Sequence, residues 1–395
     1  MKKVFDVLLY PIMALGLVGW TAKAATSSLI KIGQIVSLTG SGAPWGIPEF
    51  NALKDEVERI NTAGGILGRQ VQIIAYDYKG DQLEAINATK RLIGDGVVGI
   101  IGPGNSGAAI AMSPVTDAAG IPFITTSSSN PKVTVNADTN MVIRTAFRPS
   151  PTDPFVGAMT ARFELNDLKL KTCAIIVDIG SEFSLGLDQY FRETFIKGGG
   201  KILDREAFRN GEMDFRAILG KIKALKPDMI YMPVDMGATA LLVKQAQSLG
   251  IKSVLFASSA DTPDFPRLAG SAAEGCYVSG LVSTQTPIII GWTDEYIKKH
   301  KEIPIFPNCV LAVDAMRMYL AAIQSAKSTE SAKLITALEN LKNVPTLTGH
   351  LTMNPQTHNP TEMSCVVEVI KEGKIKFIKY ITGKLSSLNT SVEWN

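Results

Sequence analysis

Short apolar runs alternate with amphipathic stretches along the first part of the chain. Residues 49–61, for example, carry Leu53, Val57 and Ile60 on one stripe at helical spacing. The predicted strands are residues 30–38, 71–76, 97–102 and 122–125, and the predicted helices are residues 49–61, 83–93 and 107–119. This succession, with its short loops, is typical of a parallel sheet with helices on both faces, and it predicts one doubly wound α/β lobe.

A second succession of the same kind follows the proline- and serine-containing residues 149–154. Its predicted helices are residues 155–165, 185–196 and 238–249, and its predicted strands are residues 173–177, 229–233 and 254–257. Beyond Gly275 the pattern is less regular. It predicts helices around residues 292–299, 310–325 and 331–341, a hairpin of residues 363–370 and 374–382, and a loose polar tail after Lys384. By pattern alone, the chain consists of two doubly wound units in tandem.

Composition agrees with a compact protein of more than one domain. The chain has 395 residues, of which 46% are hydrophobic and only 19% are charged. A chain of this length exceeds one ordinary domain, and this apolar content gives no support to disorder.

The N-terminus has the pattern of a secretory signal peptide. Two lysines follow the first methionine, residues 7–20 are nearly all apolar, and Ala22 and Ala24 have the small-x-small spacing of a cleavage site. The alternative is a retained membrane anchor, but Pro11 interrupts an apolar run that is already shorter than the roughly 20 residues of a membrane span. We therefore expect residues 1–24 to be a signal peptide, cleaved after Ala24.

Charge and cysteine content narrow the range of partners. Removing Lys2, Lys3, Lys23 and Asp6 from 40 basic and 37 acidic residues lowers the net charge from +3 to +1. Phosphate binding needs a clustered basic surface, so we expect no nucleic-acid partner. The four cysteines have no CxxC spacing, and none lies near the predicted cleavage site. The sequence thus favours a free protein, without a lipid-modified N-terminal cysteine, in an envelope compartment such as the periplasm.

Two loops are rich in hydroxyl side chains and glycine, residues 102–107 and 125–131. Ligands of open parallel sheets bind where such loops run from strand ends into helices. Backbone N–H groups at helix starts, together with hydroxyls, suit a carboxylate or another small acceptor. The alternative is that Ser106 and Ser129 only cap helices.

The sequence favours no enzyme, cofactor or metal site. The first loop matches neither GxGxxG nor GxxxxGK[ST], and no GxSxG motif occurs. His300, His350 and His358 all fall in the last quarter of the chain, outside the predicted sheet edges. A general base or a metal ligand set is hard to assemble from them.

A series of short motifs runs in order along the predicted mature chain. They are Ile32-Gly33, Leu38-Thr39-Gly40, residues 60–69 (INTAGGILGR), Tyr76-Asp77, Gly120-Ile121-Pro122, Arg144-Thr145, Asp214-Phe215, Lys226-Pro227-Asp228 and Ala273-Glu274-Gly275. In this order and spacing, the chain resembles the type I periplasmic solute-binding proteins of the branched-chain amino acid (Leu/Ile/Val) family. The resemblance implies two doubly wound parallel-sheet lobes joined by a three-crossover hinge. Lobe 1 would comprise residues 25–148 and 279–349, lobe 2 residues 149–278 and 350–385, and a tail residues 386–395.

The resemblance also implies the ligand contacts in lobe 1. Ser106 and Ser129 match hydroxyl contacts to the ligand, Ser106 to its carboxylate, and Ser127 matches a carbonyl that accepts from its amino group. Trp45 matches an aromatic residue that closes over the ligand, and Asn105 offers a polar side chain.

In lobe 2 the chain departs from the family pattern. Phe183 stands where tyrosine is usual, and the acidic partner of the ligand ammonium falls at Ser258 or Ser259. Asp235 or Asp261 could compensate, because a buried ammonium needs a partner. If neither faces the ligand, an amide, a urea-like compound or a small carboxylate is favoured. Asp261 could instead be a turn or cap residue before Pro263.

The resemblance implies an extracytoplasmic solute-binding protein of an ABC importer. It would capture an amino acid or a related carboxylate or amide by hinge closure, act as a monomer, and be recognised by membrane permease subunits. The alternative is a ligand sensor for amides, urea-like compounds or aromatic acids that feeds a regulator or receptor.

Overall fold

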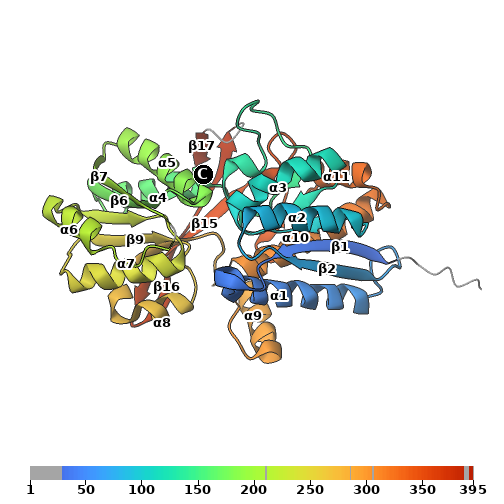
Figure 1. Cartoon of the computed structure of the whole chain (residues 1–395), viewed down its shortest axis with the longest axis horizontal. Helices are drawn as coiled ribbons and strands as arrows, with labels where there is room; N and C mark the ends of the chain where they lie inside the picture. The colour runs from blue at the N-terminus through green and yellow to red at the C-terminus, as the bar shows by residue number, and fades with distance from the viewer. Residues whose placement is uncertain (1–28, 210, 285, 305–306, 387–390, 395) are drawn as a thin grey trace, which may run out of the picture.

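The computed structural model describes residues 29–386 and 391–394, except residues 210, 285, 305 and 306, so the predicted signal peptide lies outside the described residues. Two lobes lie side by side, each built around its own sheet (Figure 1). The sheet of lobe 1 has the strand order β2-β1-β3-β4-β5, and every pair in it is parallel. Its strands are β1 (Ile30–Val36), β2 (Val71–Asp77), β3 (Gly99–Ile101), β4 (Phe123–Ile124) and β5 (Ala146–Phe147).

Helices from two distant parts of the sequence cover this sheet. They are α1 (Ala43–Thr62), α2 (Gln82–Gly94), α3 (Ser106–Ala119), α9 (Pro287–His300), α10 (Asn308–Ala326) and α11 (Ser331–Glu339). The apolar helix α10 is long enough to span a membrane, but it packs in the core of lobe 1. Its buried Tyr319 hydroxyl accepts from the Ile100 N–H at 3.0 Å and donates to the Pro122 carbonyl at 2.8 Å. The helices after Gly280 therefore belong with lobe 1, as the family resemblance implied.

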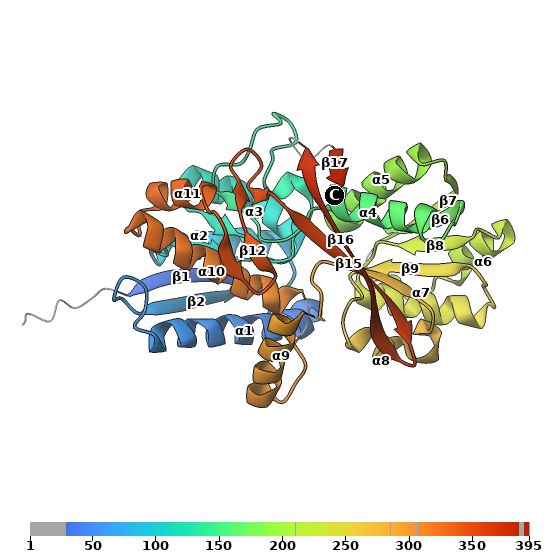
Figure 2. The same ribbon diagram turned by 180° about the vertical axis from the view of Figure 1, so that it is seen from behind.

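Lobe 2 has a larger, mixed sheet with the order β17-β16-β15-β10-β9-β8-β6-β7. Its strands are β6 (Thr172–Asp178), β7 (Lys201–Phe208), β8 (Met229–Met232), β9 (Val254–Ser258), β10 (Tyr277–Gly280), β15 (Met363–Lys371), β16 (Lys374–Ser386) and β17 (Ser391–Trp394). Its helices are α4 (Asp153–Asn166), α5 (Glu182–Lys197), α6 (Arg216–Leu225), α7 (Met236–Ser248) and α8 (Asp264–Ala269). The C-terminal strands β15 and β16 run beside the junction of the lobes (Figure 2).

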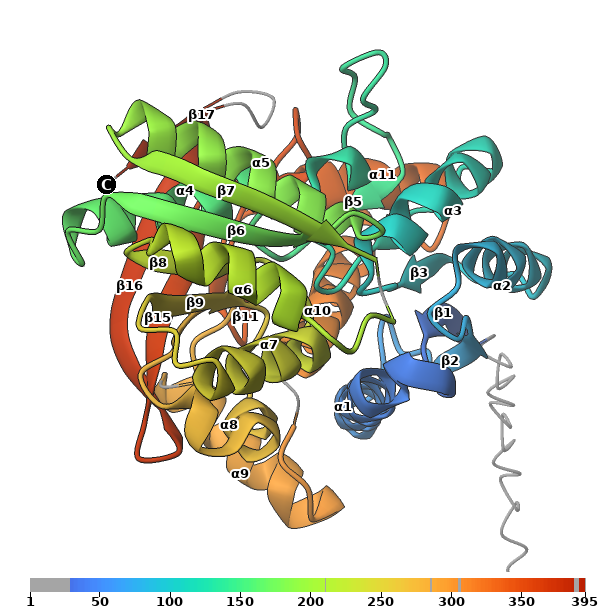
Figure 3. The same cartoon turned by 60° about the vertical axis from the view of Figure 1, so that its left-hand side comes forward.

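The chain passes between the lobes three times, before α4, after β10 and before β15. Figure 3 shows lobe 2 turned towards the viewer, with β6 and β7 in front. Two short hairpins precede the last passage and pack on lobe 1, so the chain leaves lobe 1 after Pro360 rather than at the predicted boundary after residue 349. They consist of β11 (Val344–Thr346) with β12 (Gly349–Leu351), and β13 (Met353–Asn354) with β14 (Asn359–Pro360). The predicted fold class, two doubly wound lobes joined by three crossovers, is confirmed.

Several local expectations differ from the structure, and three of the differences have a clear physical reason. Helix α1 begins at Ala43 rather than residue 49, because Pro44 lies in its first turn, where proline is tolerated, and the helix also accepts Pro48. Strand β7 was not predicted, because half of its sequence KILDREAF is charged and only its last residue is buried. The tail expected to be loose continues β16 to Ser386 and adds β17, which pairs with β16. The alternation of SVEW is too short to signal a strand without its partner.

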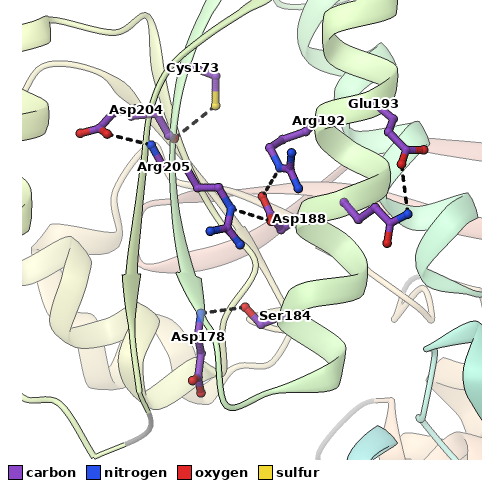
Figure 4. A network of polar contacts seen from close by, with 10 residues as sticks. Cys173, Asp178, Ser184, Asp188, Arg192, Glu193, Asp204 and Arg205 are labelled. Atoms are coloured by element: carbon purple, nitrogen blue, oxygen red, sulfur yellow. Dashed lines mark hydrogen bonds and ion pairs between the residues drawn. The ribbon is translucent and has the colours of Figure 1, made fainter.

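An ion cluster around the buried Asp188 joins α5 to β7 in lobe 2 (Figure 4). The Asp188 carboxylate, only 1% exposed, accepts from Arg192 Nε and Arg205 Nε at 2.8 Å each. Asp188→Asn leaves two cations facing a neutral amide, so we expect the free energy of unfolding to fall by about 2–3 kcal/mol. Urea denaturation measures the change. The exposed Glu193→Gln is the matched control, and equal midpoints for wild type and Asp188→Asn would contradict the role of the cluster.

Candidate functional site

A cavity of about 630 Å³ lies between the two lobes, and we call it the cleft. Lobe 1 lines it with the start of α1 and the loops after β1, β2, β3 and β4, together with the residues just before α10. Lobe 2 lines it with the loops after β6, β8, β9 and β10. The cleft thus lies at the carboxyl ends of parallel strands, where open α/β sheets bind ligands.

Two of the predicted serines in lobe 1 line the cleft. The Ser106 Oγ accepts from the Asn130 N–H at 3.4 Å, and the Ser127 Oγ donates to the Gly104 carbonyl at 3.2 Å. The interpretation of Ser106 and Ser129 as helix caps is wrong. The side chains of Asn105 and Asn130 cap α3 and the following 3₁₀ turn. Asn105 also lines the cleft, but its Oδ1 is engaged by the Ala108 N–H at 3.0 Å.

Ser129 lies behind the serines that line the cleft. It is fully buried and is not among the lining residues, and its hydroxyl faces the carboxyl group of Asp153. Burial raises the pKa of Asp153 to about 7, while Ser129 and Arg148 oppose the rise. A contact between Ser129 and a ligand therefore remains a prediction, and this arrangement does not favour it.

Sequence reasoning missed Glu49, a buried carboxyl group on the lobe 1 side of the cleft. It is 3% exposed and accepts from Asn308 Nδ2 at 3.1 Å and from the Thr126 hydroxyl at 3.4 Å. Burial raises the pKa of Glu49 to about 7 against these hydrogen bonds. The available signal was its place on the apolar stripe of α1, four residues before Leu53, where a charged residue is unexpected.

Two aromatic side chains give the cleft apolar walls on opposite lobes. Trp45, in the first turn of α1, is half-buried and packs against the core of lobe 2, so it spans the gap between the lobes. Phe183, in the first turn of α5, lines the cleft and packs against another core cluster of lobe 2. Both positions suit contact with an apolar part of a ligand.

The serine pair of lobe 2 also lines the cleft. The Ser258 hydroxyl, 1% exposed, lies 3.1 Å from the Tyr231 hydroxyl and 3.0 Å from the Ser279 hydroxyl. Ser259 has a positive φ of 61°, which turns the chain sharply after β9. This hydroxyl network holds the end of β9 in place beside Asp261.

Asp261 and Asp235 both line the cleft, but their environments differ. Asp261 is 1% exposed and its Oδ2 has no hydrogen-bond partner, and burial raises its pKa to about 7. Asp235 is exposed, and its Oδ1 caps α7 by accepting from the Ala238 N–H at 3.0 Å. The cap interpretation of Asp261 is wrong, because Pro263 precedes α8 and the Thr262 hydroxyl accepts from the Asp264 N–H.

Acidic side chains dominate the charge of the cleft. The described lining residues include five carboxyl groups and one cation, namely Glu49, Asp178, Asp235, Asp261, Asp264 and Arg267. Arg267 is 70% exposed and already pairs with Asp264 at 2.9 Å. The Asp178 Oδ1 accepts from the Gly180 N–H at 2.8 Å, and Figure 4 shows the Asp178 backbone held by Ser184. A ligand that enters this cleft therefore meets more carboxyl groups than cations.

Polar contacts already connect the two lobes on one side of the cleft. The Asn130 Nδ2 donates to the Glu182 carbonyl at 2.7 Å, and the Lys132 Nζ lies 2.9 Å from the Glu182 carboxylate. None of the three histidines is among the described residues that line the cleft. His358 instead stacks on Phe147 in the core at a ring separation of 4.1 Å.

Comparisons with known proteins agree with this geometry. The family model described as "Periplasmic binding protein" matches residues 29–374. The chain is 30% identical over 349 residues to the Leu/Ile/Val-binding protein BraC3 of Rhizobium johnstonii, covering 88% of this chain and 93% of that protein. It is 25% identical to the Leu/Ile/Val-binding protein of Escherichia coli K12, over 82% of this chain and 86% of that protein.

Two solved structures extend the similarity to the whole fold. The leucine-binding protein LivK of Thermotoga maritima superposes with a TM-score of 0.81 at 27% identity, over 89% of this chain and 98% of that one. The substrate-binding protein LivJ of Streptococcus pneumoniae, solved with isoleucine, gives a TM-score of 0.80 at 26% identity, over 89% and 100%.

Proposed function

We propose that this chain, which belongs to the periplasmic binding protein family, is an exported solute-binding protein of an ABC importer. It captures a small amino acid between its lobes by hinge closure. The names of its relatives support this class of ligand, since they describe Leu/Ile/Val binding, and one related structure holds isoleucine. Export agrees with the signal-peptide pattern of residues 1–24, and the captured solute passes to permease subunits in the membrane.

The observation that carries the choice of ligand is the unpartnered Oδ2 of Asp261 in the wall of the cleft. A buried carboxylate without a cation is costly, and a ligand ammonium at this position supplies one. The loop with Ser106 and Ser127 offers hydroxyls, and the start of α3 offers backbone N–H groups, to the ligand carboxylate. Trp45 and Phe183 contact its apolar side chain.

A solute with only a negative charge fits less well. The one cation of the described lining, Arg267, is exposed and already paired with Asp264. An aromatic acid or another simple carboxylate would therefore face Glu49 and Asp261 without a compensating charge. This charge surplus counts against the alternative of a sensor for aromatic acids.

A matched set of ligands tests the proposal. Isothermal titration of residues 25–395 at pH 7.5 should show binding of L-leucine, L-isoleucine or L-valine. 4-Methylpentanoate, which is leucine without its ammonium, should bind at least about 100-fold more weakly, as expected for the loss of one buried charge pair. Leucinamide keeps the ammonium and tests the carboxylate contact separately. Equal affinity for leucine and 4-methylpentanoate, or tight binding of benzoate alone, would rule out an ammonium site.

A further inference from the structure

A second buried carboxyl group lies behind Asp261. Glu368 belongs to β15, the strand that the chain enters after its last passage between the lobes. It is 0% exposed, and neither Oε1 nor Oε2 has a hydrogen-bond partner. Its cross-strand neighbour on β10 is Val278, which belongs to the lobe 2 core cluster that also holds Ile370. Glu368 thus occupies an apolar position that a leucine or valine would fill.

Glu368 and Asp261 lie against neighbouring positions of β10, since Glu368 pairs with Val278 and Asp261 abuts Gly280. Burial, and then the charge of Asp261, raise the pKa of Glu368 to about 8. Gly280, two residues after Val278, leaves room for Asp261, because a Cβ there would lie 2.5 Å from the Asp261 Oδ2. The two carboxyl groups therefore face one packed region behind the cleft, one at its surface and one beneath it.

Among the described residues, no buried cation balances this pair. On β16 the partner of Glu368 is Phe377, and the adjacent Lys376 and Lys379 are exposed. On β15, burial and the charge of Asp261 raise the pKa of the Cys365 thiol. On α8, Asp264 and Arg267 neutralise each other at the surface. Asp235, at the start of α7, is exposed and accepts from a backbone N–H. Across the cleft, Glu49 adds negative charge.

We propose that Glu368 is a positioning residue for the ammonium site, which holds a proton beside Asp261 in the empty protein and releases it when an ammonium-bearing solute binds. The proposal rests on the function proposed above. Binding neutralises the charge of Asp261, so the O–H bond of Glu368 breaks more easily, and its proton leaves to solvent. Glu368 does not contact the solute, because it is fully buried and is not among the residues that line the cleft.

The sign of the effect follows from proton linkage. A ligand that favours the ionised forms binds more tightly as pH rises through the pKa values of the free protein. The ionisation of Asp261 should raise the affinity for the solute around pH 7, and that of Glu368 should raise it again around pH 8. Glu368→Gln removes the second step and keeps the first.

Titration calorimetry with L-leucine in buffers of different ionisation enthalpy measures both affinity and proton release. Between pH 7.0 and 8.5, the wild-type affinity should rise by about threefold or more, whereas that of Glu368→Gln should level off. At pH 8.0 the wild type should release up to about half a proton per ligand, since a group at its pKa is half protonated. Glu368→Gln should release almost none.

Controls separate this role from a structural one. Glu164, on α4, is another buried, unpartnered carboxyl group of lobe 2, and it does not line the cleft. Glu164→Gln should therefore leave the pH dependence of affinity and the proton release unchanged. Glu368→Leu should match Glu368→Gln, and thermal unfolding confirms that each variant is folded. Identical pH profiles and proton counts in wild type and Glu368→Gln would overturn the proposal while leaving the amino-acid function intact. Failure of every ammonium-bearing solute to bind would instead remove the proposed function, and this proposal with it.

Discussion

Asp261→Asn is expected to weaken the binding of L-leucine by about 100-fold to 1,000-fold. The substitution keeps the shape of the side chain but removes the negative charge that faces the ligand ammonium. Truncating one member of a buried, hydrogen-bonded charge pair costs about 3–4 kcal/mol, which corresponds to this loss. Isothermal titration at pH 7.5 measures it. Binding of 4-methylpentanoate, which has no ammonium, should be unchanged or improved in the same variant.

Asp235→Asn is the matched control, because it changes an acid that also lines the cleft. Asparagine is as good a helix cap as aspartate, so α7 should keep its start. An exposed carboxylate contributes little to a charge pair, and we expect a change in affinity below about fivefold. If Asp235→Asn abolished leucine binding while Asp261→Asn did not, the ammonium partner would be Asp235.

The stability of the ligand-free protein is expected to be highest near pH 5 and to fall towards pH 8. Burial raises the pKa of Glu49, Asp153 and Asp261 to about 7 and that of Glu368 to about 8. Between the unfolded pKa near 4 and these values, the folded state keeps protons that the unfolded chain loses. For each group that keeps its proton in the folded state, the free energy of unfolding falls by about 1.4 kcal/mol for every unit by which the pH rises. Thermal scans from pH 5 to 8.5 should show a midpoint that falls steadily as the pH rises.

One buried group acts in the opposite direction. Burial lowers the pKa of His358 to about 4. The neutral imidazole therefore contributes to the free energy of unfolding above its ordinary pKa of about 6.5, and this contribution is lost as the pH falls towards 4. Asp153→Asn removes one of the retained protons and should flatten the decline between pH 5 and 7. A midpoint that rose steadily from pH 5 to 8 would show that these carboxyl groups are ionised in the folded protein.

Much of the fold was accessible from the sequence, because it depends on local patterns. Apolar runs of strand length and the helical stripe of α1 report directly on which face of an element is buried. The same patterns placed the serine loops at the carboxyl ends of strands, and Ser106 and Ser127 do line the cleft. Strand β7 was missed because an edge strand with exposed side chains carries almost no apolar signal.

What the sequence could not decide is which carboxyl groups the fold removes from water. Asp235 and Asp261 were equal candidates by sequence, and only the tertiary structure exposes one and buries the other at the cleft. Asn308, in a distant part of the chain, donates a hydrogen bond to Glu49, and the distant Asp261 raises the pKa of Glu368. Sequence periodicity fixes the face of an element on which a side chain lies. Its neighbours, its burial and therefore its charge are decided when distant elements pack together.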